Sequence, residues 1–338
     1  MNPLVSICIP VYNAGPYLDA CLQSVFLQSL PDSEIIAIDD GSSDSSLKTL
    51  QDYALRYPQL KVSVNPVNLG LVGNWNRCLE LACGTWIKFV FQDDLLDPDC
   101  ISKMVEAGNR GGGGLVVCRR EFLLEENASA ELKHYFQHTI LTPESIFANK
   151  VPEYLSASAM SALSVKYMSL NFIGEPSTIL FKKMILQETG LFDARLSQIC
   201  DLEFCLRLAT REGMTYVPET LVQFRVHANS ATSSNTTRKR FSSLYSDPAM
   251  LSYKMLYDPV FKPFRSALSF IQKFKLRLYH SMKLYEAHLF LSSPAASEAI
   301  SQSQILRELP GFERGSDPGI ITRLAYLLAK ARRKQTTP

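Results

Sequence analysis

The chain has 338 residues, enough for one large domain with an appendage or for two smaller domains. Hydrophobic residues make up 46% of it and charged residues 20%, a composition that excludes a disordered or low-complexity protein. The formal net charge of +2 hides an asymmetry, because the residues from Arg238 onwards contain 17 lysines and arginines but 7 acidic residues. A basic end on an acidic body predicts two surfaces with different partners.

No targeting or membrane-spanning segment is expected. The opening residues MNPLVSICIP lead directly into a strand pattern and carry no basic region typical of a signal peptide. Nowhere do about 18 apolar residues follow one another. The eight cysteines lack CxxC spacing and lie mostly among apolar residues, which predicts buried, reduced thiols. We therefore expect a cytoplasmic protein.

Strands and helices are predicted to alternate along the first part of the chain. Apolar, β-branched runs predict strands at 4–9, 34–39, 61–64, 86–91 and 115–118. Apolar residues three and four apart predict helices at 17–28, 47–56, 71–82 and 98–107. This alternation is typical of βαβ units, and it predicts an α/β fold with a mostly parallel twisted sheet flanked by helices.

The second part of the chain is less regular. A strand at 177–181 and a helix at 201–211 follow a region of uncertain order, 121–172. A polar stretch at 230–237 is the best domain boundary. Beyond it, one long amphipathic helix is predicted at 263–291 and a shorter one at 320–330. We therefore divide the chain into a catalytic and binding domain at 1–235 and a basic, mainly helical region at 236–338.

Two acidic pairs lie at predicted strand ends. Asp39 and Asp40 end one strand, and Asp93 and Asp94 follow another. In α/β sheets ligands collect at the carboxyl ends of the strands. Adjacent carboxylates can hold Mg²⁺ or Mn²⁺, although they also serve as turn formers. The chain has neither a Walker A sequence nor a G-x-G-x-x-G after its first strand, so kinase and NAD-binding functions lose their main support.

Five segments closely resemble the family 2 glycosyltransferases, which have the GT-A fold and are mostly inverting. They occur in the family's order and cover residues 4 to about 233. The segments are VSICIPVYNAGPYLDACLQSV, EIIAIDDGSSDSS, NLGLVGNWNRCLELACGTWIKFVFQDDLLDP, GLFDARLSQICDLEFCLRL and VPETLVQFRVHANS. The resemblance implies a GT-A domain, here with a helical C-terminal extension, and places the variable acceptor side at 121–172.

The resemblance also implies where the nucleotide binds. The residues that match the loop cradling the base are Pro10, Tyr12 and Asn13. Asp40 matches the carboxylate that hydrogen-bonds the base, with Asp39 beside it. For Tyr12, a packed aromatic is the alternative.

The residues implied to bind the metal and to act in catalysis lie in the later segments. In QDD, Asp93 would lie near the ribose and Asp94 would hold the metal, although Phe91 stands where many members have another acid. Asp201 matches the general base, with a helix-capping role as the alternative. His227 falls in the family's R-x-H, where it would contact metal, diphosphate or acceptor, and a structural hydrogen bond is equally open.

The implied activity is transfer of a sugar from a nucleoside-diphosphate sugar to an acceptor hydroxyl with inversion, using Mn²⁺ or Mg²⁺. The implied acceptor is a carbohydrate or a lipid-linked molecule, in polysaccharide or glycolipid assembly. One alternative is a catalytically silent sugar-nucleotide-binding scaffold. Another is a sugar nucleotidyltransferase, which would need a basic, glycine-rich loop after the first strand that 11–17 does not supply.

The predicted helix at 263–291 carries basic residues around an apolar stripe, namely Arg265, Lys273, Lys275, Arg277 and Lys283. Three explanations are open: packing against the catalytic domain, peripheral docking on an anionic face of the cytoplasmic membrane, and pairing with a second copy in a homodimer. A nucleic-acid partner is not expected, because no aromatic and basic binding motif accompanies the charge.

Overall fold

A computed structural model describes residues 2–29, 32–230 and 242–292, together with 319, 322, 323 and 325–327. The chain divides into two compact units. The first comprises Met1–Met160, Asn171–Ala194 and Cys200–Ser233. The second comprises Ser161–Leu170, Arg195–Ile199 and Ser234–Pro338.

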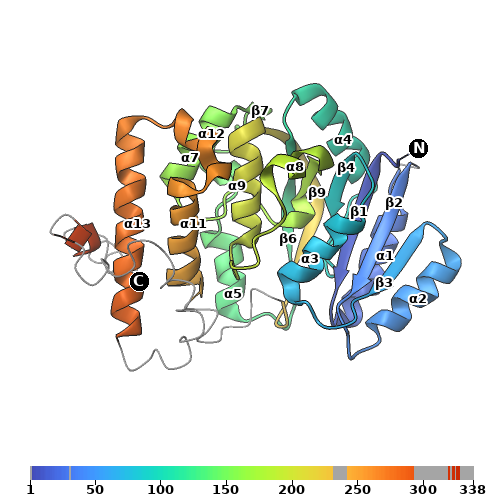
Figure 1. Ribbon diagram of the computed structural model, residues 1–338. Coiled ribbons are helices and arrows are strands. Elements are labelled where there is room, and N and C mark those ends of the chain that lie inside the picture. The colour runs from blue at the N-terminus through green and yellow to red at the C-terminus, as the bar shows by residue number, and fades with distance from the viewer. Residues whose placement is uncertain are drawn as a thin grey trace. The chain divides into compact units, whose positions relative to one another are not determined.

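The first unit begins with four parallel strands. They are β1 (Val5–Val11), β2 (Ser33–Asp39), β3 (Leu60–Val64) and β4 (Trp86–Phe89), in the order β3-β2-β1-β4. The helices that connect them are α1 (Leu18–Phe26), α2 (Ser46–Arg56) and α3 (Gly70–Leu81). Figure 1 shows this alternation from blue to cyan. Parallel neighbours need such crossovers, so the expected βαβ organisation is confirmed.

The sheet continues beyond β4 as a mixed sheet, which has nine strands in the described part of the chain. Strand β8 (Ile179–Lys182) runs antiparallel to both β4 and β6 (Leu115–Leu124). The long strand β9 (Met214–Val226) runs parallel to β6. Two short strands, β5 (Leu95–Leu96) and β7 (Tyr154–Leu155), pair antiparallel with β9. The α/β fold is confirmed, with parallel pairing among the first four strands and between β6 and β9.

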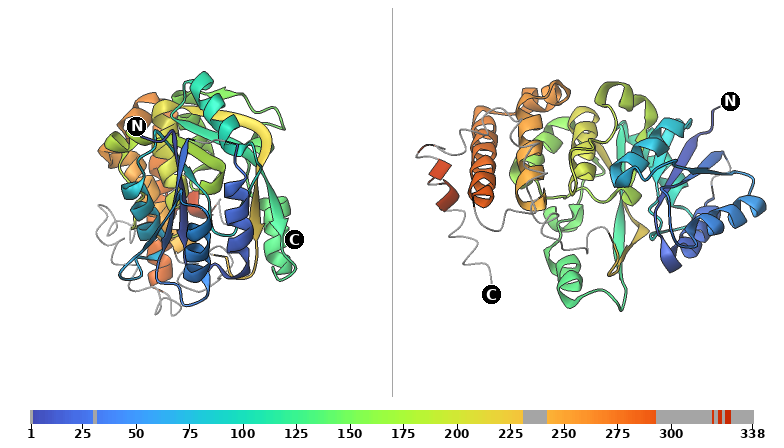
Figure 2. Two further views of the ribbon diagram at one scale, coloured as in Figure 1. Left: turned by 90° about the vertical axis from the view of Figure 1, so that its right-hand side faces the viewer. Right: turned by 60° about the horizontal axis from the view of Figure 1, so that its bottom comes forward.

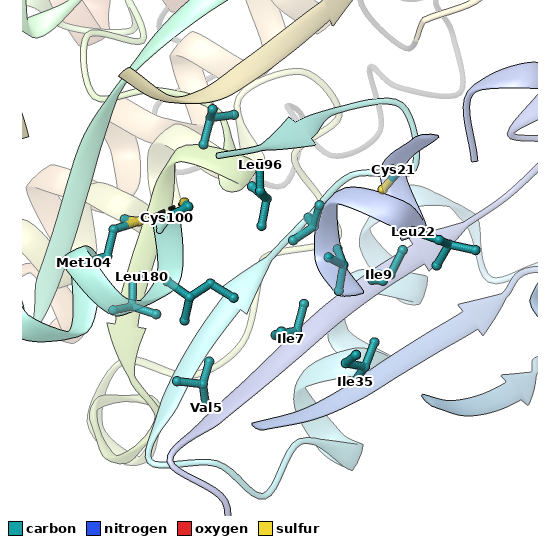
Figure 3. Close-up of a cluster of buried hydrophobic side chains, with 14 of the residues drawn as sticks. Val5, Ile7, Ile9, Cys21, Leu22, Ile35, Leu96, Cys100, Met104 and Leu180 are labelled. Atoms are coloured by element: carbon teal, nitrogen blue, oxygen red, sulfur yellow. Dashed lines mark hydrogen bonds between the residues drawn. The ribbon is translucent and has the colours of Figure 1, made fainter. Parts of the chain in front are cut away.

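Both faces of the sheet are covered by apolar side chains. On one face, Ile7 and Ile9 of β1 belong to the same buried cluster as Leu22 of α1 and Met104 of α4 (Cys100–Gly111) (Figure 3). On the other face, an aromatic cluster joins Trp75, Phe89, Phe181, Phe192 and Phe204. Burial on both faces explains why the first strands are nearly continuous apolar runs.

The remaining helices of the first unit include α9 (Cys200–Glu212), which the sequence predicted, and several short ones. These are α5 (Ala130–His134), α6 (Pro143–Ile146) and α8 (Leu186–Thr189), with short 3₁₀ or π turns at Gly15–Tyr17, Tyr135–Thr139, Pro176–Thr178 and Lys183–Ile185. Helix α7 (Ala157–Tyr167) begins in the first unit and ends in the second.

The second unit is helical. Its described helices include α11 (Asp247–Tyr257), α12 (Lys262–Ala267) and α13 (Phe270–Leu291), with turns at Ser242–Ser246 and Pro259–Phe261. Helices α11 and α13 lie side by side (Figure 2), and the buried Ser252 hydroxyl lies 3.0 Å from Nδ1 of His280 between them. The sequence analysis did not predict α11, because polar Ser252 and Lys254 lie on its buried face and interrupt the apolar pattern.

One helix prediction in this region is wrong. Residues 263–291 do not form one helix, because Leu268 is extended and Ser269 begins a new helix. The Ser269 hydroxyl accepts from the backbone N–H of Gln272, and the Gln272 side chain accepts from Ser269 N–H, which is a capping box. Most of the predicted helix at 320–330 and of the boundary at 230–237 lies outside the described residues.

None of the eight cysteines forms a disulfide, and Cys83 is the exposed one. Among the described residues, no helix is long and apolar enough to cross a membrane.

Candidate functional site

The loop that follows β1 is joined to the acidic loop that follows β4. Pro10 lies within β1 in register with Ile38 of β2, and the Tyr12 side chain beyond it is 49% exposed. The backbone N–H of Tyr12 donates to Oε1 of Gln92 (2.7 Å), and Nε2 of Gln92 donates to the Tyr12 carbonyl (3.1 Å). Gln92 immediately precedes the two acids of QDD, so the paired bonds hold the two loops together.

Asn13 joins the same loop to the one after β2. Its backbone has φ of 47°, in the left-handed region that asparagine tolerates better than most residues. Its Oδ1 accepts from the backbone N–H of Ser43 (2.8 Å), and its own N–H donates to the Ser42 hydroxyl (2.9 Å). The backbone therefore turns directly after β1, and Asn13 ties this turn to the loop after β2.

The two acids at the end of β2 are both buried but have different partners. Oδ2 of Asp39 accepts from the backbone N–H groups of Gly41 (3.0 Å) and Ser42 (2.9 Å). Its Oδ1 has no hydrogen-bond partner among the described residues. Oδ1 of Asp40 accepts from Nδ2 of Asn65 (2.8 Å) and from the backbone N–H of Leu69 (2.8 Å), and so anchors the loop before α3. An unpaired buried acceptor is costly, so Asp39 Oδ1 is the better placed of these two oxygens to meet a ligand.

The fold brings together Asp93 and His227, which are 134 residues apart in the sequence. Nε2 of His227 lies 2.9 Å from Oδ2 of Asp93. The His227 ring packs against Tyr17 with centroids 4.5 Å apart, and its Nδ1 has no partner in the described part of the chain. His227 is positioned because it directly follows β9, whose Arg225 donates from Nε to the Asp93 carbonyl (2.8 Å).

Asp94 points the other way, into the protein. Its side chain is fully buried, and its Oδ1 accepts from the backbone N–H of Arg225 (3.0 Å). Burial, and secondly the neighbouring charge of Asp93, raise the pKa of Asp94 well above its usual range. Asp94 therefore ties the QDD loop to β9, and Asp93 is the acid of this pair that faces His227.

Asp201 is the second residue of α9. Its Oδ1 accepts from the backbone N–H of Leu202 (2.7 Å), one residue ahead, whereas an N-cap side chain reaches two or three residues ahead. Its Oδ2 accepts from Nδ2 of Asn171 (3.1 Å). Burial is the main cause that raises the pKa of Asp201 to about 7, and the charge of Glu175 adds to it.

The sequence analysis missed several site residues, among them Asn171, Glu175 and Arg225. Glu175 forms an ion pair with Arg120, whose Nε lies 2.5 Å from Oε2 of Glu175. The charge of Glu175 raises the pKa of both Asp94 and Asp201, so its field reaches both acids. The signal that could have found Glu175 is an acid at the start of the short turn Pro176–Thr178, which leads into β8. Arg225 was visible in the R-x-H motif, but its contacts with the QDD loop were not.

The side chains of Asp93 and His227 could together bind a divalent metal. Among the described residues, no group of three or more histidines, cysteines and acids could hold a metal ion by itself. Asp93 and His227 nevertheless offer one carboxylate oxygen and one imidazole nitrogen side by side. Sites that share a metal with substrate phosphates commonly use one or two protein ligands, so this pair fits such a metal.

Comparisons with known proteins identify the family. Residues 6–170 match the family model described as Glycosyl transferase family 2. The uncharacterized glycosyltransferase EpsJ of Bacillus subtilis is 36% identical over 118 residues, which is 35% of this chain and 34% of the relative. The chain spans about two thirds or less of the length of the curated relatives that it matches.

Two solved structures share the fold. S. aureus TarS 1–349 in complex with UDP-GlcNAc superposes with a TM-score of 0.61 at 16% identity, over 98% of this chain and 91% of that one. A mannosyltransferase from Pyrobaculum calidifontis, in complex with GDP-Man and Mn²⁺, superposes with a TM-score of 0.52 at 17% identity, over 98% of this chain and 88% of that one. The family match over residues 6–170 and the curated relatives show that the chain belongs to the family 2 glycosyltransferases. The solved structures and the mixed sheet show that it has the GT-A fold.

Proposed function

We infer that this chain is an inverting glycosyltransferase that moves a sugar from a nucleoside-diphosphate sugar to an acceptor hydroxyl, in polysaccharide or glycolipid assembly. The observation that carries the proposal is the environment of Asp201, whose pKa is raised to about 7 while Asn171 holds one of its oxygens. A general base works best when its pKa lies near the operating pH.

The donor would bind at the carboxyl ends of β1 and β2. The exposed Tyr12 ring offers a face for a nucleotide base. Oδ1 of Asp39 is a buried acceptor that a base N–H can pair with. The nucleotide sugars bound by the two structural neighbours support a donor of this class.

A divalent cation would be held by Asp93 and His227, with diphosphate oxygens of the donor completing its coordination. Carboxylate and imidazole together suit Mn²⁺, whereas Mg²⁺ prefers oxygen ligands alone. When bound, such an ion offsets the negative charge that builds on the leaving diphosphate. To ligate, Nε2 of His227 must present a lone pair, so the histidine has to be neutral and its proton has to sit on Nδ1.

Asp201 would take the proton of the acceptor hydroxyl. Its hydrogen bond from Asn171 leaves the second lone pair of Oδ2 available and fixes the direction of the carboxylate. With a pKa of about 7, a substantial fraction is ionised at neutral pH. A base that activates the acceptor itself leads to a single displacement, and hence to inversion, and contributes about 100- to 10,000-fold to the rate.

The proposal is tested by incubating the purified chain with UDP-, GDP- and dTDP-sugars in the presence of Mn²⁺, Mg²⁺ or EDTA. We expect slow, metal-dependent release of one nucleoside diphosphate, and loss of that release in Asp93→Ala. Transfer to an added acceptor should fall by at least about 100-fold in Asp201→Asn while donor binding is kept. Binding of a nucleotide sugar without turnover of any donor would instead identify a silent scaffold.

A further inference from the structure

The first turns of α13 expose large apolar side chains to solvent. A helix at a protein surface normally turns its apolar stripe inwards and its polar side outwards. Here Phe270 is 83% exposed, Ile271 is 65% exposed and Phe274 is 50% exposed. These three residues, called the α13 apolar face below, lie on one side of the helix because they are one, three and four positions apart.

The opposite side of α13 is the one that packs within its unit. Its buried residues are Leu276, His280, Lys283, Leu284, Glu286 and Ala287. Helix α11 lies against α13 (Figure 1), and their contact includes the buried Ser252 and His280 pair. The α13 apolar face is therefore not the side by which the helix is attached to its unit. Adjacent exposed apolar side chains of this size mark an interaction surface.

The charge around this face is of one sign. Residues 262–277 contain five basic residues and no acidic residue. One of the five, Arg265, donates to the carbonyls of Met255 and Asp258. Within the described part of the chain, Lys273, Lys275 and Arg277 form no ion pair. A cationic ring around aromatic and aliphatic side chains is complementary to an anionic surface with an apolar interior.

We propose that the α13 apolar face docks on the surface of an anionic lipid bilayer. The Phe and Ile side chains would enter the boundary between headgroups and acyl chains, while Lys273, Lys275 and Arg277 reach the lipid phosphates. A second copy of the chain is a poorer occupant, because a symmetric contact would bring two clusters of uncompensated positive charge together. The docking surface is independent of the proposed sugar transfer.

The test uses the full chain and sedimentation with vesicles of phosphatidylcholine alone or with about a third phosphatidylglycerol, in about 0.15 M salt. We expect binding to the anionic vesicles and at least about tenfold weaker binding to the neutral ones. Phe270→Ser with Phe274→Ser, and separately Lys273→Gln with Lys275→Gln and Arg277→Gln, should each weaken anionic binding by about tenfold or more.

Matched controls come from α2 of the first unit. Leu55 is 86% exposed, and the Lys48 side chain is 75% exposed, so Leu55→Ser and Lys48→Gln remove the same kinds of group elsewhere. Both controls should bind like the unchanged protein, and circular dichroism should show every variant folded. Equal binding to both vesicle types, or anionic binding that survives both α13 variants, would overturn the proposal. So would a dimer in light scattering that Phe270→Ser with Phe274→Ser converts to monomer.

Discussion

Asn171 donates a hydrogen bond from Nδ2 to Oδ2 of Asp201 at 3.1 Å, and the same side chain shapes the loop in which it lies. Its Oδ1 accepts from the backbone N–H groups of Ile173 and Gly174, and its Nδ2 also donates to the Gly174 carbonyl. A hydrogen bond to a carboxylate favours its ionised form, so Asn171 lowers the pKa of Asp201 against the effect of burial.

Replacing this donor should therefore make the base harder to ionise. In Asn171→Ala the pKa of Asp201 rises further, and the acidic limb of the kcat/KM profile moves to higher pH. Activity should fall several-fold at neutral pH and recover in alkaline buffer. Asn76→Ala is a matched control, because Asn76 bridges the backbone of Phe192 in a similar way without touching Asp201. An unchanged pH profile in Asn171→Ala would contradict the positioning role.

Replacing Glu175 should move the acidic limb of the kcat/KM profile to lower pH, opposite to the effect of Asn171→Ala. In Glu175→Gln a negative charge that raises the pKa of Asp201 is lost, so the pKa falls and the acidic limb moves to lower pH. Arg120 loses the charge of its buried partner, which should cost about 3 kcal/mol of folding free energy. Pairing the pH profile with thermal unfolding separates the two effects. A limb that stays in place while the protein is destabilised would assign Glu175 to structure alone.

The folded protein should become more stable when Asp201 is made neutral. Its pKa is about 7 when folded but about 4 when unfolded, so the folded state binds more protons between these pH values and stability is lost as the pH rises. Asp201→Asn removes this cost. We expect little difference from the unchanged protein near pH 4, and a gain of up to about 4 kcal/mol near pH 8.

Urea unfolding across this pH range measures the effect directly. A gain in stability accompanied by a loss of transfer would be the expected trade-off between stability and function at a catalytic group. Should Asp201→Asn be less stable than the unchanged protein at pH 8, the carboxylate would be serving the fold.

The two acids of QDD can be told apart by conservative replacement. Asp93→Asn should abolish the rise in melting temperature that Mn²⁺ gives in the presence of UDP, because an amide is a weak ligand. Asp94→Asn should keep most of that rise, because its Oδ1 can still accept from Arg225 and the buried carboxyl already has a raised pKa. The reverse result would return the metal to Asp94, the residue that the family resemblance implies.

The sequence predicted the parallel half of the sheet well, because strands buried on both faces leave continuous apolar runs and their helices have a clear period. It failed where non-local contacts decide the structure. Strand β9 is interrupted by Pro218 and Glu219 and has no such run. At 263–291 the apolar period continues through Ser269, and only the capping box of that residue shows where one helix ends.

The sequence names candidate site residues, but it does not say which of their atoms meet. Adjacent acids such as Asp93 and Asp94 look alike in a sequence, and their contacts with β9 and the residue after it distinguish them. The backbone N–H of Arg225 donates to Asp94, whereas the ring of His227 contacts Asp93. Likewise, Glu175 and Arg120 are 55 residues apart, and no local pattern connects them.

The two hydrogen bonds between Gln92 and the backbone of Tyr12 make one mechanical unit of the loop that follows β1 and the loop that carries Asp93. A nucleotide base bound at Tyr12 and a cation bound at Asp93 therefore restrain the same backbone torsion angles, those of the two joined loops. Part of the entropy lost on ordering these loops is lost only once, whichever ligand arrives first. Thermodynamic reciprocity then requires the nucleotide to increase the affinity for the cation by the same factor as the cation increases the affinity for the nucleotide. In Gln92→Ala both factors should become smaller, and they should remain equal to each other.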